Sequence, residues 1–203
     1  MTERPLLYVL RHGETDWNLE RRLQGQTDTP LNATGRAQAY AMAEGLARLI
    51  ERPREVDFVT SPLSRAVETM EVVAQRLSVS YRREPRLIEL SFGACEGLTW
   101  PELNRMGVDP DADPDGYHDW RPDRGESYAD AAERIGDWLA GLERPTVLVS
   151  HGAVSRVLRG VALGLGKREV VLLPVPQDRF FRIAKGSLEW FDAPVAPSLE
   201  SIR

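Results

Sequence analysis

The chain is poor in cysteine, in histidine and in long apolar runs, and these shortages exclude several classes of protein. Its single cysteine, Cys95, cannot form an internal disulfide, and no CxxC or HExxH pattern offers a zinc site. No histidine neighbours Cys95, so we expect a packed small residue rather than a nucleophile. The apolar run at residues 6–10 is too short for a signal peptide or a membrane span. We therefore expect a cytoplasmic protein with no membrane partner.

Positive charge is also in short supply. The net charge is -5 at pH 7 and the isoelectric point is about 5.4, which gives no support for a nucleic acid or an anionic membrane as a partner. Hydrophobic residues make up 42% of the chain and charged residues 28%, which is ordinary for a globular protein. The 203 residues suit a single domain, and no repeat, linker or low-complexity tract divides them. Any anion site must therefore be local.

Two of the three histidines follow apolar segments that are typical of buried strands. Residues 6–10 run into Arg11 and His12, and residues 146–150 run into His151. A lone histidine at a strand end is most often structural. Two in matching contexts, one beside an arginine, favour a shared site, because open α/β sheets bind ligands at the carboxyl ends of their strands.

Strand-like and helix-like segments alternate along the chain. This alternation predicts a three-layer α/β/α sandwich with a mostly parallel central sheet, and the last strands should lie at an edge of that sheet. The predicted strands are at 6–10, 56–60, 86–90, 146–150, 170–173, 180–183 and 188–191, and the predicted helices are at 32–50, 62–77, 98–106, about 128–142 and 154–165.

Arg65 lies in the opening turn of the helix that is predicted to start with Pro62. The helix macrodipole opposes a cation at this position, and an anion between the two would resolve the conflict. The structural alternative is an exposed arginine that pairs with Glu68. That alternative is the weaker one, because a cation that precedes its anion along a helix is the poorer order. We therefore favour an anion-binding role for Arg65.

Two carboxylates compete for the role of proton donor. Glu89 lies at the end of an apolar segment, where a buried carboxyl group can serve as an acid. The alternative for Glu89 is a carboxylate at a strand edge that faces solvent. Glu96 lies on a loop between Cys95 and Gly97, so we expect it to contact backbone groups or a basic side chain instead.

Two irregular segments are expected to border the strand ends. The polar segment 14–29 contains Asn18 and Gln24, whose neutral hydrogen-bonding groups suit a phosphate site or simply hold the loop together. Residues 98–125 begin as a short amphipathic helix and continue as a stretch dense in Pro, Gly and Asp, which predicts a lid or cap inserted in the single domain 1–203. The acidic excess of this lid argues against a highly anionic substrate. His118 within it is expected at the surface unless the lid closes.

Together these residues fit phosphoryl transfer through a histidine. Arg11 and Arg65 would hold the phosphate oxygens, and their charge would keep His12 neutral and nucleophilic. Glu89 would protonate the leaving alkoxide and then take a proton from the water that hydrolyses phosphohistidine. His151 would donate to the phosphoryl oxygens as charge develops. No carboxylate cluster suits Mg²⁺, and this chemistry needs neither a metal nor a cofactor.

The motifs also occur in a familiar order along nearly the whole chain: Leu10-Arg11-His12-Gly13-Glu14-Thr15, Asn18, Leu23-Gln24-Gly25, Ser61-Pro62-Leu63-Ser64-Arg65-Ala66, Thr69, Glu89, Gly93, Glu96-Gly97 and Ser150-His151-Gly152. This combination resembles the histidine phosphatase superfamily, also called phosphoglycerate mutase-like proteins. The resemblance implies an α/β/α sandwich in which His12 is the phosphorylated nucleophile and Glu89 is the proton donor. It further implies a phosphate pocket completed by Arg11, Arg65 and His151 and lined by Asn18, Gln24, Gly25 and Gly152.

Within the superfamily, the sequence favours the phosphatase branch. Leu90-Ser91-Phe92-Gly93 follows Glu89, whereas cofactor-dependent phosphoglycerate mutases resemble one another in having Arg-His-Tyr-Gly there. The chain is also shorter than typical mutases and lacks their richer basic cap. The resemblance thus implies a metal-independent phosphomonoesterase that acts on small-molecule phosphate esters. The alternatives are a cofactor-dependent phosphoglycerate mutase and a non-catalytic phospholigand-binding module, although binding alone needs no proton donor.

The leaving group and the oligomeric state stay open at this point. Four aromatic residues could form a wall that favours hydrophobic or sugar phosphates, or they could be ordinary packing residues: Trp17, Trp100, Tyr117 and Trp120. A homodimer is plausible only because twofold oligomers are the commonest kind.

Overall fold

A mixed six-stranded sheet organises residues 5–194, the part of the chain that the computed structural model describes. The strand order is β3-β2-β4-β1-β5-β6. Strands β1 to β4 run parallel to one another, β5 is antiparallel to β1, and β6 is antiparallel to β5. Their bounds are Leu7–Arg11 (β1), Asp57–Thr60 (β2), Arg82–Arg83 (β3), Thr146–Ser150 (β4), Arg179–Ala184 (β5) and Ser187–Asp192 (β6).

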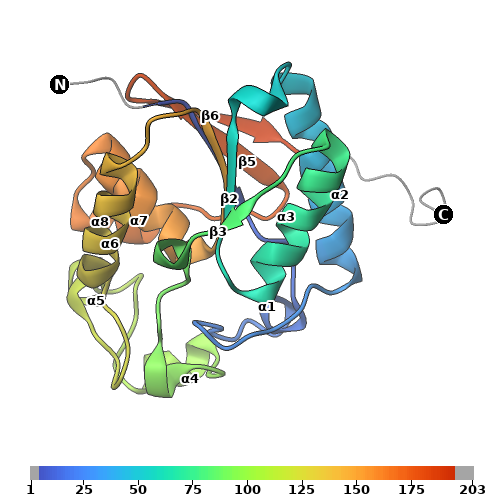
Figure 1. Ribbon diagram of the computed structural model, residues 1–203. Helices are drawn as coiled ribbons and strands as arrows, with labels where there is room; N and C mark the ends of the chain where they lie inside the picture. Colours follow the sequence, from blue (N-terminus) through green and yellow to red (C-terminus); the bar gives the residue numbers. More distant parts are fainter. Residues whose placement is uncertain (1–4, 195–203) are drawn as a thin grey trace.

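Helices cover both faces of the sheet, which confirms the predicted α/β/α sandwich (Figure 1). Helices α2 (Ala33–Leu49) and α3 (Ser64–Leu77) lie on one face, and α6 (Tyr128–Ala140) and α7 (Gly152–Leu163) lie on the other. The short helix α1 (Asp16–Leu19) lies beyond the carboxyl ends of the parallel strands. Among residues 5–194, no helix combines the length and the apolar composition that crossing a bilayer requires.

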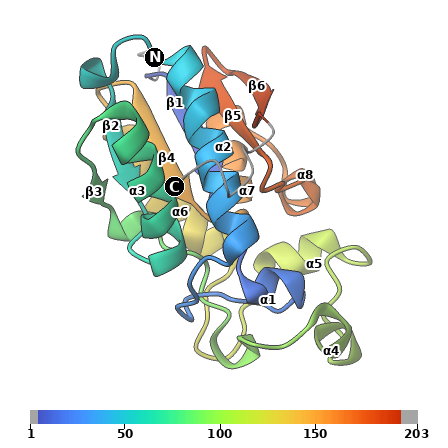
Figure 2. The same ribbon diagram turned by 90° about the vertical axis from the view of Figure 1, so that its right-hand side faces the viewer.

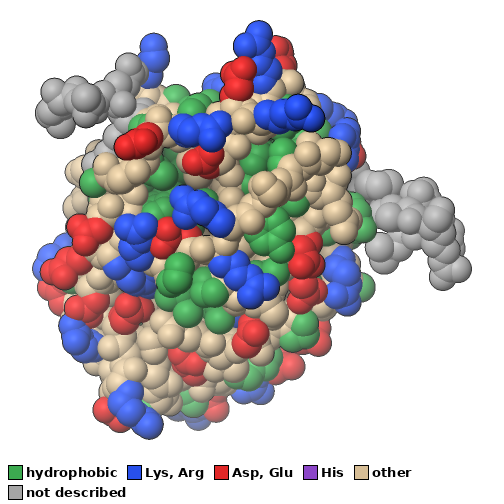
Figure 3. Space-filling model, viewed as in Figure 1, with side chains coloured by type: hydrophobic (Ala, Val, Ile, Leu, Met, Phe, Trp, Pro, Cys, Tyr) green, Lys and Arg blue, Asp and Glu red, His purple; other side chains and the backbone are tan. Residues whose placement is uncertain are grey.

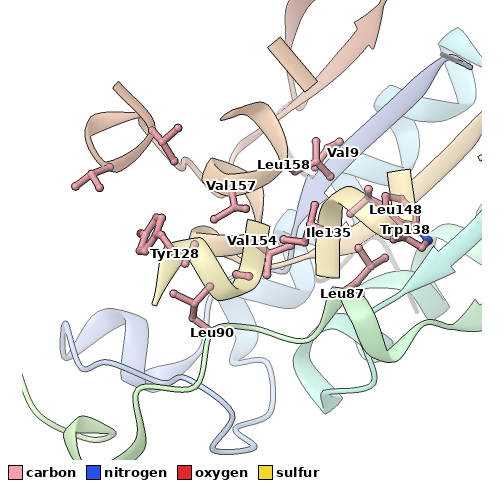
Figure 4. Packing of buried hydrophobic residues seen from close by; sticks show 14 of the residues in the cluster. Val9, Leu87, Leu90, Tyr128, Ile135, Trp138, Leu148, Val154, Val157 and Leu158 are labelled. Atoms are coloured by element: carbon pink, nitrogen blue, oxygen red, sulfur yellow. The ribbon is translucent and has the colours of Figure 1, made fainter. Parts of the chain in front are cut away.

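The parallel strands are buried on both sides, which explains their continuous apolar runs. Successive side chains point to opposite faces, so Leu7 and Val9 of β1 pack with α6 and α7, whereas Tyr8 and Leu10 pack with α2 and α3. Figure 4 shows the first of these two cores, in which Val9 and Leu148 of the sheet meet Ile135, Trp138 and Leu158 of the helices. This double packing holds the central strands, and therefore their carboxyl ends, in fixed positions.

The strand predicted at 86–90 is wrong. Residues Pro85–Leu87 form a 3-10 helix (η2), because proline suits a first helical turn and the Glu84 carboxylate accepts a hydrogen bond from the backbone N–H of Arg86. The edge strand is the preceding two-residue β3, which pairs with β2. Glu89 therefore lies in an irregular segment after η2 and not at the end of a strand.

The strand predicted at 170–173 is also wrong, because these valine-rich residues belong to helix α8 (Lys167–Leu172). The Glu169 carboxylate accepts a hydrogen bond from the backbone N–H of Gly166 at 2.8 Å and fixes the helix start. Burial of Val170 and Val171 against the core is achieved from a helix as well as from a strand.

A smaller correction concerns α3, which begins at Ser64, so Pro62 precedes its first turn.

The predicted lid region, 98–125, contains two short helices, α4 (Trp100–Arg105) and α5 (Pro114–Asp119). In both views these helices lie with α1 at the same end of the sheet (Figures 1 and 2). Helix α5 falls in a stretch that was expected to be irregular. Its first turn has Pro114, and the Asp113 side chain accepts a hydrogen bond from the backbone N–H of Gly116.

An aromatic cluster attaches α5 to the rest of the molecule. Tyr117 stacks on Trp120 with ring centroids 5.7 Å apart and meets the edge of Tyr128, in α6, at 5.8 Å. His118 lies beside the same Tyr128 ring, and its side chain is only 13% exposed. His118, expected at the surface unless the lid closes, is thus partly buried: its ring lies against α6, while its Nδ1 contacts the exposed carboxylate of Asp119.

Candidate active site

The register of β1 and β4 brings the two strand-end histidines together. Arg11 pairs with Ser150 across the two parallel strands, and the backbone N–H of His12 donates to the Ser150 carbonyl at 2.9 Å. The rings of His12 and His151 consequently lie next to each other, with centroids 5.2 Å apart. Both rings are almost fully buried. The shared site that the sequence favours therefore has a structural basis in adjacent strands.

The protonation of His12 follows from its surroundings. Its Nδ1 lies 2.7 Å from the Gly13 carbonyl oxygen, which can only accept, so Nδ1 carries the proton and Nε2 keeps a lone pair. Burial, aided by the charges of Arg65 and Arg11, holds the pKa of His12 well below its ordinary value of 6.5. His12 is thus a neutral imidazole with a free nucleophilic nitrogen.

His151 lies beside His12 with one ring nitrogen engaged and one without a partner. Its Nε2 lies 2.6 Å from Ser61 Oγ, while Nδ1 finds no hydrogen-bond partner within residues 5–194. Ser61 Oγ also accepts from the backbone N–H of Leu63, so its own proton can point at His151 Nε2, which leaves the ring proton on Nδ1. Burial, aided by the charges of Arg65 and Arg11, keeps the pKa of His151 well below 6.5. A buried N–H donor therefore awaits an acceptor beside His12.

Two arginines carry the positive charge of the histidine site. Arg65 is fully buried and donates to the carbonyls of Thr27 and Gly25 at 2.9 and 2.7 Å, and Arg11 donates to the carbonyl of Val175. The Nε groups of both arginines are buried and without a partner in the described part of the chain. Burial lowers the pKa of Arg11 to about 10, and the nearby Glu89 partly opposes this shift. Unpartnered guanidinium N–H groups of this kind suit an anion.

The alternative pairing of Arg65 with Glu68 does not form. Glu68 pairs instead with Arg36 at 3.3 Å, on the outside of the molecule. The buried Arg65 side chain points across to the 14–29 segment, where it fixes two backbone carbonyls. The conflict with the macrodipole of α3 is therefore left for a bound anion to resolve.

Glu89 is buried beside the start of α7. Its carboxylate accepts hydrogen bonds from three backbone N–H groups, those of Leu90 at 3.0 Å and of Ala153 and Val154 at 3.2 Å each. The residue is 8% exposed, so the alternative of a carboxylate that faces solvent is wrong. The backbone thus fixes the position of this carboxyl group in the site.

Glu96 has a different role, as the sequence predicts. Its carboxylate accepts from the backbone N–H groups of Gln26, Thr27 and Phe92, at 2.9 to 3.2 Å. Gly25 lies so close that an added Cβ would stand 2.2 Å from Glu96 Oε1, and its φ of +53° favours glycine in any case. Glu96 therefore braces the loop that carries the Arg65 acceptors.

The two predicted amides lie at the same end of the sheet. Gln24 Oε1 accepts from the hydroxyl groups of Thr15 and Thr29, and Asn18 Oδ1 accepts from Gln177 Nε2 at 3.1 Å. Because the amide oxygens are occupied within the protein, the NH₂ groups stay available as neutral donors. Gln177 was not predicted as a site residue from the sequence. Its Nε2 also donates to the carbonyl of His12, so it joins the Asn18 side chain to the histidine.

These side chains line one cavity of about 360 Å³ at the carboxyl ends of the parallel strands. His151, whose ring lies beside that of His12, is not part of this lining, and the other predicted site residues are: Arg11, His12, Asn18, Gln24, Gly25, Arg65, Glu89 and Gly152. Of the four aromatic candidates, Trp100 and Tyr117 line the cavity, and Trp17 and Trp120 do not. The 98–125 segment thus contributes aromatic rings to the cavity.

The cavity is more cationic than the lid composition predicts. Its lining includes five arginines and a single carboxylate, Glu89; the arginines are Arg11, Arg21, Arg22, Arg65 and Arg156. The acidic residues of the 98–125 segment lie outside this lining, so their number says little about the charge that the substrate meets. On the outer face shown in Figure 3, by contrast, basic and acidic side chains are interspersed.

Within residues 5–194, no three His, Cys, Asp or Glu side chains gather as a metal site would require.

Sequence comparison assigns the chain to a family. Residues 7–182 match the histidine phosphatase superfamily (branch 1). The chain therefore belongs to this superfamily, and the fold agrees, since solved members superimpose on nearly its whole length.

Named relatives include both mutases and phosphatases. A probable phosphoglycerate mutase GpmB of Proteus mirabilis is 33% identical over 199 residues, which cover 95% of this chain and 87% of that protein. A glucosyl-3-phosphoglycerate phosphatase of Mycolicibacterium vanbaalenii is 37% identical over 177 residues, 78% of this chain and 74% of that protein. The solved structure of a mycobacterial glucosyl-3-phosphoglycerate phosphatase with VO3 has a TM-score of 0.76 at 28% identity and covers 97% of this chain and 100% of its own. The same phosphatase has also been solved with inorganic phosphate.

Proposed function

We propose that this protein is a phosphomonoesterase that hydrolyses small-molecule phosphate esters through a phosphohistidine on His12. One observation carries the proposal: the backbone holds the neutral His12 ring with Nε2 free, beside two arginines with unpartnered Nε groups. Attack on a phosphate dianion requires a nucleophilic atom that carries no proton, here His12 Nε2, next to cations that are held in place.

In the first step, His12 Nε2 attacks phosphorus and the bond from phosphorus to the ester oxygen breaks. Arg11 and Arg65 hold the phosphoryl oxygens through their free N–H groups. Glu89 gives its proton to the leaving alkoxide, and the three backbone N–H groups that bind the carboxyl group keep it in position. The alcohol leaves and His12 carries the phosphoryl group.

In the second step, water attacks the phosphohistidine and Glu89 takes a proton from that water. The bond from phosphorus to His12 Nε2 breaks, inorganic phosphate forms, and each group regains its starting protonation state. His151 Nδ1–H supports both steps, because it can donate to a phosphoryl oxygen as negative charge develops. The positive charge in this scheme comes from the arginines, so we propose a reaction that is independent of metal.

A mutase would use the same groups but pass the phosphoryl group to a second substrate hydroxyl, and the GpmB relatives keep this candidate open. We favour hydrolysis because of the 98–125 segment, which we propose acts as a lid. Its Arg121 binds Asp130, and its Arg105 donates to the Pro101 carbonyl, so both lie outside the cavity lining. The arginines of the cavity come from other segments, so the 98–125 segment adds aromatic rings and no basic side chain of its own with which a closing lid could retain a doubly phosphorylated intermediate.

The test is phosphate release from aryl phosphate, phosphoglycerates, sugar phosphates and α-ribazole phosphate, with EDTA present. We expect phosphate release that continues in the presence of EDTA and disappears in His12→Ala. The relative rates of release rank the esters as substrates. Acid-labile phosphate on His12 after rapid quenching would identify the intermediate. Transfer between phosphoglycerates without net release would favour a mutase. If wild type shows no turnover and His12→Ala binds the esters with the same affinity as wild type, a binding module is favoured.

A further inference from the structure

We infer that Arg159 is a positioning residue, which fixes the segment 173–177 and through it the Arg11 guanidinium group at the phosphate end of the cavity, beside His12. Arg159 itself is not part of the cavity lining, so it touches neither the substrate nor the reacting atoms. The inference rests on the proposed function for its effect on turnover, and phosphate binding tests it separately. It arises from a buried charge for which the fold alone gives no reason.

Arg159 is buried as a cation without an anion. The residue lies on α7, is 1% exposed and, within residues 5–194, pairs with no carboxylate. Burial lowers its pKa to about 10, and the charge of Arg156 adds to the shift. Burying an unpaired charge costs free energy, and an apolar side chain of similar volume would avoid that cost. Packing alone would therefore not select an arginine at this position.

The Arg159 guanidinium group has defined contacts on three sides. Its Nε donates to the Ser155 carbonyl, one turn back on α7, at 3.1 Å. The group also lies over the rings of Phe181 in β5 and Trp190 in β6, 5.2 and 5.5 Å from their centroids, and such contacts partly offset the burial of charge. In the described part of the chain, its one hydrogen bond outside its own helix runs from Nη2 to the Pro174 carbonyl at 2.8 Å.

The segment 173–177 connects α8 to β5 and has no regular secondary structure (Figure 1). Its sequence is Leu-Pro-Val-Pro-Gln, and the two prolines have no backbone N–H to donate. Three successive carbonyls of the segment accept hydrogen bonds from arginine side chains. The pairs are Leu173 with Arg156 at 2.8 Å, Pro174 with Arg159 at 2.8 Å, and Val175 with Arg11. Arginine side chains thus hold this segment in place.

The same segment holds groups of the phosphate site. Val175 and Gln177 line the cavity, and the Val175 carbonyl accepts a hydrogen bond from Arg11 Nη1. Gln177 Nε2 donates at 3.1 Å to both the His12 carbonyl and Asn18 Oδ1. A movement of the segment would therefore shift the attachments of three site residues together.

Arg11 depends most on this support. A guanidinium group is planar, so the bond from Nη1 to the Val175 carbonyl also sets the direction of Nε, which has no partner in the described part of the chain. An alanine Cβ at Gly152 would lie 3.6 Å from Val175 Cγ2 and 3.7 Å from the Arg11 guanidinium carbon, so the segment and Arg11 pack closely against the start of α7. Loss of the Arg159 attachment should therefore weaken the contact of Arg11 with phosphate.

Calorimetric titration with inorganic phosphate measures this effect in Arg159→Met, which removes the donor and keeps an apolar side chain in its place. We expect the phosphate affinity to fall by about tenfold to a hundredfold, the effect of misplacing a site contact by roughly 1 Å. Stability to urea should be kept or raised, because the variant buries no charge. Arg168→Met removes an exposed arginine of α8 as the matched control and should keep the wild-type affinity.

Steady-state kinetics separate this role from that of the proton donor. The value of kcat/KM in Arg159→Met should fall by the same factor for aryl and alkyl phosphates, because both share the phosphoryl group that Arg11 holds. A fall confined to alkyl phosphates would place the effect at the leaving group and would contradict the inference.

A double-mutant cycle measures whether Arg159 acts through Arg11. Arg11→Lys keeps a charge for phosphate but lacks the planar group that the segment orients. In this background Arg159→Met should weaken phosphate binding by less than about threefold. Equal effects of Arg159→Met in the two backgrounds would refute the positioning role. A loss of stability in Arg159→Met with unchanged phosphate affinity would also refute it, because the role would then be structural alone.

Two further results keep the inference apart from folding and from the proposed function. If Arg159→Met does not fold, the double variant Pro174→Gly and Pro176→Gly loosens the segment while Arg159 stays in place. It should lower the phosphate affinity, and an unchanged affinity would refute the role of the segment. If wild type releases no phosphate from any ester but Arg159→Met still weakens phosphate binding, the phosphatase proposal fails and the positioning role stands.

Discussion

Mild acid should destabilise the folded protein through the two buried histidines. In the unfolded chain each histidine binds a proton with a pKa near 6.5, whereas burial holds the pKa values of His12 and His151 well below 6.5 in the fold. At a pH between the pKa of the unfolded state and that of the folded state, the unfolded chain binds more protons than the folded protein. The free energy of unfolding therefore falls as the pH falls below about 6.5, until the folded-state pKa values are reached.

The size of this effect follows from the same linkage. Each histidine that stays neutral in the fold lowers the free energy of unfolding by about 2 kcal/mol between pH 7.5 and 5.0, so the pair accounts for about 4 kcal/mol. This is a large share of the roughly 5–15 kcal/mol that holds most domains folded. Carboxylates contribute mainly at lower pH. The side chain of Arg86 holds the pKa of Glu84 at about 2, for example, and the stability linked to Glu84 is lost only below about 4.5.

The assay is urea unfolding at several pH values between 7.5 and 5.0, followed by tryptophan fluorescence. His12→Gln and His151→Gln should each remove about half of the pH dependence, and the double variant should remove most of it. His118→Gln serves as the matched control, since it removes a histidine and leaves both site histidines in place. A wild-type stability that is flat over this range, or a slope that survives in the double variant, would refute the assignment of neutral buried histidines.

Three further outcomes test the site and its frame. Glu89→Gln should slow alkyl phosphates by about 10²–10⁴-fold and aryl phosphates far less, because only a poor leaving group needs the proton; steady-state rates on both ester types measure this, and equal losses would contradict the acid role. Gly13→Ala should destabilise the protein by about 1–3 kcal/mol in urea unfolding, because the new Cβ would lie 2.1 Å from the Gly35 carbonyl oxygen. Gly136→Ala in α6 meets only Val161 at 3.9 Å and should stabilise by about 0.5–1 kcal/mol, and a loss of stability there would contradict this account of the glycines.

The part of the site that could be predicted from the sequence lies on the strongest elements. Buried parallel strands give long apolar runs, so the ends of β1 and β4, with His12 and His151, can be located from hydrophobicity alone. Arg65 could be found because its charge conflicts with the helix that carries it. In each case a residue type departs from what local structure prefers, and that departure is visible in one dimension.

The remainder depends on local helix caps that override composition and on contacts between segments distant in the sequence. The segments at 86–90 and 170–173 have strand-like composition, but local capping by Glu84 and Glu169 selects helical turns. The charge of the cavity could not be read from the lid composition, because the acidic side chains there point elsewhere. Arg156, which also lines the cavity, could have been predicted from the sequence, because it follows Gly152 by four residues and lies on the same face of α7.

Glu96 gives the loop at 25–27 a fixed attachment that lies just before the proposed lid. Its carboxylate ties this loop to Phe92, and the chain then turns at Gly97, where φ is +86°, before α4 begins. The phosphate end of the cavity is therefore supported from outside the 98–125 segment. If the proposed function holds, we expect insertions or replacements in that segment to alter which alcohols are accepted while the phosphoryl chemistry stays intact. One architecture can in this way acquire new substrates in evolution without rebuilding its catalytic groups.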